Sequence, residues 1–210
     1  YVLTGLLGGV AVPDDLPAAP WSAIGIDPHT VLVRLHTVLE LPRALMVRPV
    51  QAVEPSATAQ PLPLADWLWL ETLSGVPLIH AALADHLIPQ MLNYESTGGV
   101  SFKKGCYPGQ EVVARSQFRG TLKRRLYLVR TSVQLQSGQD VLSRPSAEEV
   151  TGLVVQAAPL PAMEPAQWVA SVSVQIAAAE SDTGLYVQSS EGPIVPLTLL
   201  DRPYPLLENI

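Results

Sequence analysis

Short apolar runs separated by turn residues mark much of the chain and predict strands rather than long helices. Near the start, residues 1–4, 30–35 and 44–49 form such runs, rich in Val, Leu and Met. Runs of this kind that are bounded by Gly, Pro and Asp are typical of strands. Residues 10–20 contain several Pro and Asp residues and predict a loop.

The middle of the chain begins without a regular pattern. Residues 49–65 are rich in Pro, Ala and Gln and show no hydrophobic period, so we expect a connector there. Asp66 can then cap a short helix over residues 67–73, which Gly75 ends. Residues 1–120 therefore predict a body of mixed α/β character.

Beyond Leu122 the pattern changes to regular short strands. Apolar runs with turn residues between them occupy residues 126–129, 152–155, 169–176, 185–187 and 194–197. Several short strands at such spacing are typical of an antiparallel barrel or sandwich. We therefore predict an α+β fold of two domains, residues 1–120 and residues 121–210, of which the second is an antiparallel β-barrel.

The composition is typical of a soluble protein with a sizeable core. Of the 210 residues, 48% are apolar and 15% are charged, which is enough for one or two buried cores. No apolar run reaches the length of a membrane span and no basic leader is present, so we expect no membrane contact. Because the chain opens inside a strand-like run at Tyr1, we expect a fragment of a longer protein.

The charge is unevenly distributed along the chain. Eight basic residues and one acidic residue, Glu111, lie between Lys103 and Arg130, so this segment carries a formal charge of +7 in a chain whose net charge is −6. One interpretation is a solvated face of a strand and a helix. The other is a site for an anionic partner, such as a polyglutamylated cofactor tail, a phosphate or an RNA.

Cys106 is the only cysteine of the chain. It cannot form an internal disulfide, so a reducing, cytoplasmic location is expected. A lone cysteine is often an inert buried residue. Here, however, Pro108 and Glu111 predict the start of a helix just after Cys106, and Lys104 lies just before it. A helix N-terminus and nearby ammonium groups favour the thiolate, so the context favours a reactive cysteine over an inert one.

Other chemistries lack their motifs. The sequence contains no Gly-rich phosphate loop followed by Lys, and residues 5–9 do not fit the dinucleotide-binding pattern. The four histidines show no paired helical spacing and Cys106 has no partner cysteine, so no metal is expected. A Cys–His hydrolase stays open, although no familiar motif surrounds Cys106. Trp67 and Trp69 are either core aromatics or a flat wall for a fused ring such as a pterin.

The segment Lys103-Lys-Gly-Cys-Tyr-Pro-Gly-Gln-Glu111 resembles the Lys-Gly-Cys-Tyr-x-Gly-Gln-Glu signature of the YgfZ family. That family is related to the aminomethyltransferase (T-protein) of glycine cleavage, and the resemblance is most specific over residues 67–127. It implies a T-protein-like fold. Residues 1–120 would be the remainder of a folate-binding body whose N-terminal part is absent, and residues 121–210 would be its C-terminal β-barrel.

The resemblance also implies a function. Members of the family bind folate and support certain iron–sulfur enzymes, including enzymes that modify tRNA. The expected cofactor is tetrahydrofolate or a one-carbon derivative, and the expected partners include tRNA or another anionic partner at the basic segment 103–130. By position, the expected catalytic residues are Cys106 and Lys104, and the expected folate-binding residues are Trp67, Tyr107, Gln110, Glu111 and Arg119.

Two functions of other classes are alternatives to a folate-binding accessory protein. A tetrahydrofolate-dependent aminomethyltransferase would make the chain an enzyme that transfers a one-carbon unit. Leu73, however, stands where T-proteins have the glutamate that holds the pterin. A plain RNA- or partner-binding barrel would use the basic segment alone. The accessory protein with a functional Cys106 is the preferred hypothesis, and whether it catalyses a reaction is left open.

Overall fold

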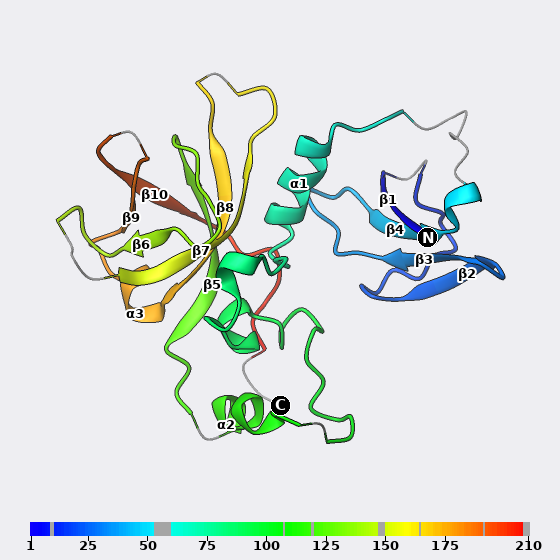
Figure 1. Ribbon diagram of the computed structural model, residues 1–210, viewed down its shortest axis with the longest axis horizontal. Helices are drawn as coiled ribbons and strands as arrows, with labels where there is room; N and C mark the ends of the chain where they lie inside the picture. Colours follow the sequence, from blue (N-terminus) through cyan, green and yellow to red (C-terminus); the bar gives the residue numbers. More distant parts are fainter. Residues whose placement is uncertain are drawn as a thin grey trace. The chain divides into compact units, whose positions relative to one another are not determined.

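The structure is a computed structural model that describes residues 1–8, 11–52, 60–106, 108–118, 120–146, 150–163, 165–190 and 192–207. Figure 1 shows the course of the chain. The chain divides into two compact units, Tyr1–Trp67 and Leu68–Ile210, and the division falls within helix α1 (Leu64–Leu73). Each unit is described by itself.

The first unit is built on a four-stranded antiparallel sheet with the strand order β1-β4-β3-β2. Its strands are β1 (Val2–Leu7), β2 (Ala23–Asp27), β3 (Thr30–Arg34) and β4 (Arg43–Arg48). One face of the sheet packs against the loop after β1, where Val12 and Leu16 form a core with Leu32 and Ala44. The strands predicted near residues 1–4, 30–35 and 44–49 are confirmed.

The second unit is built on a closed antiparallel barrel with the strand order β10-β5-β8-β7-β6-β9 (Figure 1). Its strands are β5 (Arg124–Thr131), β6 (Asp140–Leu142), β7 (Val150–Pro159), β8 (Trp168–Gln175), β9 (Leu185–Gln188) and β10 (Ile194–Leu200). Fully buried valines such as Val129, Val154 and Val172 fill its interior. The predicted α+β fold with a C-terminal antiparallel barrel is confirmed.

The segment before the barrel packs on the barrel's outer surface. The short 3-10 helices η2 (Ala81–Leu83) and η3 (Pro89–Leu92) bury Leu83 and Leu92 against Leu126 and Val155 of the barrel. Strand β8 is covered on its outer face as well, because Ser173 Oγ donates a hydrogen bond to the carbonyl oxygen of Met91 at 2.9 Å. The barrel therefore forms one unit with residues from Leu68 onward, although its first strand starts close to the predicted boundary at residue 121.

Both predicted helix starts need correction. Helix α1 begins at Leu64 rather than at residue 67, so Asp66 lies in its first turn and is not its cap. Helix α2 (Gln110–Phe118) begins two residues after Pro108, because Gly109 adopts a left-handed φ of 83° that no helix accommodates.

The remaining helices are the 3-10 turn η1 (Val50–Ala52) and the short helix α3 (Ile176–Ala179). Within the part of the chain that the structure describes, no helix has the length and apolar character needed to cross a membrane.

Candidate functional site

Cys106 lies on an exposed loop that leads into helix α2. The residues from Lys103 to Cys106 are all exposed, Lys104 among them. Helix α2 begins four residues after Cys106, with Gln110 half-buried and Glu111 exposed in its first turn. The expected exposure and position beside a helix start are therefore observed, whereas the chemical role of Cys106 stays a prediction.

Two of the predicted folate-binding residues, Tyr107 and Arg119, lie outside the described residues. The structure thus places Lys104, Cys106, Gln110 and Glu111 on one continuous segment of the second unit, while Trp67 belongs to the first unit. No group of three His, Cys, Asp or Glu side chains that could hold a metal occurs among the residues described.

The Cys106 loop is fixed at two points. The rings of Phe102 and Phe118 meet edge to face with their centroids 5.6 Å apart, which brings the start of the loop to the end of α2. Gln90, which is 1% exposed, donates from Nε2 to the carbonyl oxygen of Val113 at 2.7 Å. The aromatic pair thus joins the start of the loop to α2, and α2 is tied to η3, so the cysteine lies on a loop whose two ends are held.

A buried ion pair holds the turn from which this loop departs. Arg125 on β5 donates to Oε1 of Glu95 at 2.6 Å, and the Glu95 side chain is completely covered. Arg125 also donates to Oδ1 of Asn93 at 3.2 Å, and Asn93 donates from Nδ2 to the carbonyl oxygen of Leu126 at 3.0 Å. A charge removed from water in this way requires its partner. The turn at residues 93–97 is therefore anchored to the barrel.

The C-terminal segment adds a second anchor to the same turn. The Tyr204 hydroxyl donates to the carbonyl oxygen of Gly75 at 2.7 Å, and the backbone N–H of Leu207 donates to Ser96 Oγ at 3.0 Å. Gly75 has a φ of +66°, and a Cβ added there would lie 2.8 Å from the Tyr204 ring. Burial raises the pKa of Tyr204 to about 12. The tail thus joins the end of α1 to the support of the Cys106 loop.

Trp67 packs within the first unit. Its indole lies so close to Gly5 that a Cβ on that glycine would be 2.7 Å from the ring. The guanidinium of Arg43, which is 1% exposed, lies 4.7 Å from the centroid of the indole. Trp67 itself is half-buried. The contacts with Gly5 and Arg43 agree with the interpretation as a core aromatic, whereas a role of Trp67 toward a ligand stays a prediction.

The basic segment 103–130 does not present one uniform surface. The exposed basic residues of this segment that the structure describes are Lys103, Lys104, Arg115, Lys123 and Arg130. Arg125, in contrast, forms an ion pair with the buried Glu95. The exposed positive charge of the segment therefore comes from residues near Cys106, from the entry to the barrel at Lys123 and from Arg130 near the end of β5.

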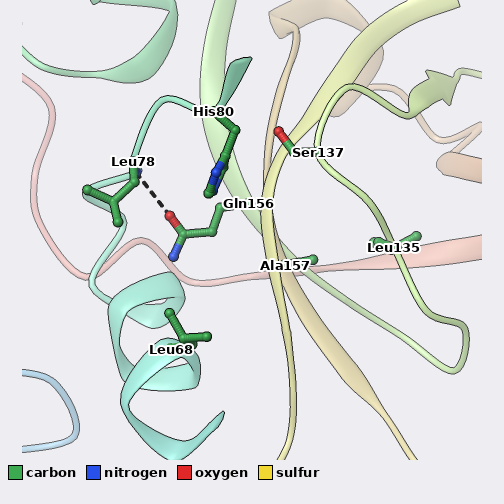
Figure 2. Close-up of a pocket in the computed structure, with 7 residues that line it drawn as sticks. All are labelled: Leu68, Leu78, His80, Leu135, Ser137, Gln156 and Ala157. Atoms are coloured by element: carbon green, nitrogen blue, oxygen red, sulfur yellow. Dashed lines mark hydrogen bonds between the residues drawn. The ribbon is translucent and has the colours of Figure 1, made fainter. Parts of the chain in front are cut away.

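The second unit also contains a cavity of about 200 Å³, which none of the described residues of the Cys106 loop lines. It lies between α1 and the segment after it on one side, and strand β7 and the β5–β6 loop on the other (Figure 2). Its apolar walls are Leu68, Leu78, Leu135 and Ala157, and its polar groups belong to His80, Ser137 and Gln156. Sequence reasoning missed this cavity. The available signal was Gln156, a polar residue in the otherwise apolar run at residues 152–158.

Two comparisons relate the chain to known proteins. Among curated proteins it is similar to the tRNA-modifying protein YgfZ of Escherichia coli O45:K1 (strain S88 / ExPEC), with 48% identity over 77 residues, or 36% of this chain and 24% of that protein. Among solved structures it is similar to the glycine cleavage system aminomethyltransferase T from Bartonella henselae, with a TM-score of 0.60 and 12% identity over 87% of this chain and 51% of that one. No protein-family model matches the chain.

The structural likeness, at 12% identity, establishes the fold: the chain has the architecture of part of a T-protein-like aminomethyltransferase. The sequence likeness confirms the resemblance to the YgfZ-type family, which the motif around Cys106 indicated. The matched regions span about a quarter of the curated relative and about half of the solved structure. These comparisons therefore do not establish the activity, substrates or partners of the whole protein.

Proposed function

We propose that this chain is part of a folate-binding accessory protein that supports iron–sulfur enzymes and tRNA modification in a reducing cytoplasm. The observation that carries the proposal is the exposed Cys106 on a fixed loop before α2, in a chain similar to a protein named tRNA-modifying. In this proposal Cys106 is the functional residue, and Lys104 lies two residues before it in the sequence.

The surroundings of Cys106 suit a macromolecular partner. The cysteine and the lysines just before it are exposed, so another protein can contact this segment. The exposed charges of Lys103, Lys104 and Arg115 would attract an anionic partner such as tRNA, an effect that weakens as salt screens it over about 10 Å at 0.1 M. The proposal therefore places partner contacts at the Cys106 loop and the first turns of α2.

Folate is the proposed cofactor, as tetrahydrofolate or a one-carbon derivative. The candidate for contact with its pterin ring is Trp67, whose half-buried indole already contacts Gly5 and Arg43 and keeps only part of its surface exposed. The resemblance to the YgfZ family also assigns Gln110 and Glu111, on α2 of the second unit, to the binding of this cofactor. Folate, when bound, supplies a carrier for one-carbon units, and the residues of this chain would hold and orient it.

Aminomethyl transfer of the T-protein type is the less favoured function. The structural likeness to an aminomethyltransferase concerns the fold alone. Position 73, near the end of α1, carries a leucine where the T-protein reaction needs a carboxylate close to the folate. The accessory role requires no such carboxylate, because its proposed centre is Cys106.

The folate part of the proposal can be tested on the complete protein by titration with tetrahydrofolate. Trp67→Ala is expected to weaken binding about tenfold or more, because a stacked aromatic contributes about 1 kcal/mol beyond its buried area. Trp69→Ala, on the opposite side of the same helix, is the matched control. An unchanged affinity in a Trp67→Ala variant that melts like the wild type would remove Trp67 from the folate site.

A further inference from the structure

The cavity shown in Figure 2 has the properties of a binding site for an uncharged molecule. Among the described residues that line it there is no Asp, Glu, Lys or Arg, and the only titratable side chain is His80. Leu68 and Leu78 come from α1 and the segment after it, whereas Leu135 and Ala157 belong to the barrel and its β5–β6 loop. Two apolar walls on separate elements of one unit suit a flat ring between them.

The polar groups lie at one side of these walls. In Figure 2 the Ser137 oxygen is on the side of its loop that faces His80. The Ser137 hydroxyl is buried and has no hydrogen-bond partner among the described residues, while the exposed His80 ring is close enough to line the same cavity. A buried hydroxyl without a partner is costly, and a ligand that pairs with it removes that cost.

Gln156 lines the cavity, but both polar atoms of its side chain already form hydrogen bonds within the protein. Its Oε1 accepts a hydrogen bond from the backbone N–H of Leu78 at 3.0 Å, and its Nε2 donates to Thr72 Oγ1 at 3.1 Å. The Gln156 side chain is 5% exposed. It joins β7 to α1 and to the segment that follows α1. The cavity is therefore held open by hydrogen bonds that are already made, and it needs no ligand to form.

We propose that this cavity binds a neutral, flat heterocycle of the size of one nucleobase, with its ring between the leucine walls and its polar edge against Ser137 and His80. A volume of about 200 Å³ equals roughly seven waters at about 30 Å³ each, which is enough for a bicyclic ring but not for a whole folate. The site goes beyond the proposed function, because none of the residues that line it belongs to the Cys106 loop.

The experiment uses the complete protein with ¹³C-methyl-labelled leucine, whose methyl signals are followed by NMR. Guanosine and 6-hydroxymethylpterin are the probes, because their rings share the same amino–oxo edge, and together they distinguish a nucleoside from a free pterin as the source. Binding of at least one probe should shift the methyl signals of Leu68, Leu78 and Leu135. It should leave unchanged those of Leu199, an exposed residue of β10, a strand that contributes no residue to the cavity lining. The proposal is overturned if neither probe moves these three signals at millimolar concentration.

Substitutions at two serines of the same loop supply matched controls. Ser137→Ala should weaken binding about fivefold through the lost hydrogen bond, and Ser137→Leu should abolish it by filling the cavity. Ser132→Ala and Ser132→Leu, at an exposed position of the loop, should bind like the wild type. His80→Ala, also at an exposed position, tests the site if Ser137→Leu does not fold. Wild-type affinity in both Ser137→Ala and His80→Ala would contradict the proposed polar edge.

Discussion

The ion pair between Arg125 and Glu95 should be the most sensitive point of the second unit. Arg125→Met removes the cation and leaves the Glu95 carboxylate, whose side chain is 0% exposed, without its partner at 2.6 Å. Removal of one member of a buried pair costs about 3–5 kcal/mol, which is a large part of the roughly 5–15 kcal/mol by which a domain is stable. The loss also releases Asn93 from its contact with Arg125.

The loss of free energy of unfolding can be measured by urea denaturation of the complete protein and checked by calorimetry. Arg124→Met is the matched control: it replaces the neighbouring arginine, which points to the other side of β5 and is likewise half-buried. Its free energy of unfolding should change by less than about 1 kcal/mol. Arg125→Met combined with Glu95→Leu should recover much of the lost stability, because neither charge then remains buried alone. Equal stability of Arg124→Met and Arg125→Met would refute the reasoning.

Two further predictions concern the C-terminal segment. Gly75→Ala should destabilise the protein by about 2 kcal/mol or more in thermal melts, because φ is +66° and the new Cβ meets the Tyr204 ring. Gly192→Ala, whose Cβ meets nothing within 4 Å, should be nearly neutral. Because burial raises the pKa of Tyr204 to about 12, the stability that its neutral form contributes is complete below pH 10 and lost as the pH rises toward 12. In Tyr204→Phe the free energy of unfolding should fall less between pH 10 and pH 12 than in the wild type. The same pH dependence in both proteins would contradict this role of Tyr204.

The sequence predicted the barrel well because its strands are apolar, regularly spaced and bounded by turns. Strand β6 escaped prediction, since it has only three residues, Asp140–Leu142, and its pairing with β7 and β9 defines it more than its composition does. Strand β2 escaped because Gly25 and Asp27 interrupt its apolar pattern. Pairing partners supplied by the rest of the fold decided both strands.

Only the part of the candidate site that lies in the motif around Cys106 could be predicted from the sequence. The helix after Cys106 followed from Pro108 and Glu111 at helix-start positions, although Gly109 delays its start to Gln110. The pairing of Arg125 with Glu95 did not follow, because a run of basic residues before a strand gives no sign of which one is buried. Such long-range contacts depend on how η3 and the turn at residues 93–97 pack on the barrel.

The most direct test of the central claim compares two readouts for Cys106 variants of the complete protein. In cells that lack their own copy, the amount of a tRNA modification made by an iron–sulfur enzyme is measured, and the purified variants are titrated with tetrahydrofolate. Cys106→Ala and Cys106→Ser should both lose the tRNA modification while binding folate and melting like the wild type. Ser101→Ala, at an exposed position five residues earlier, should retain both. Wild-type levels of the modified tRNA in cells that carry Cys106→Ala would contradict the account.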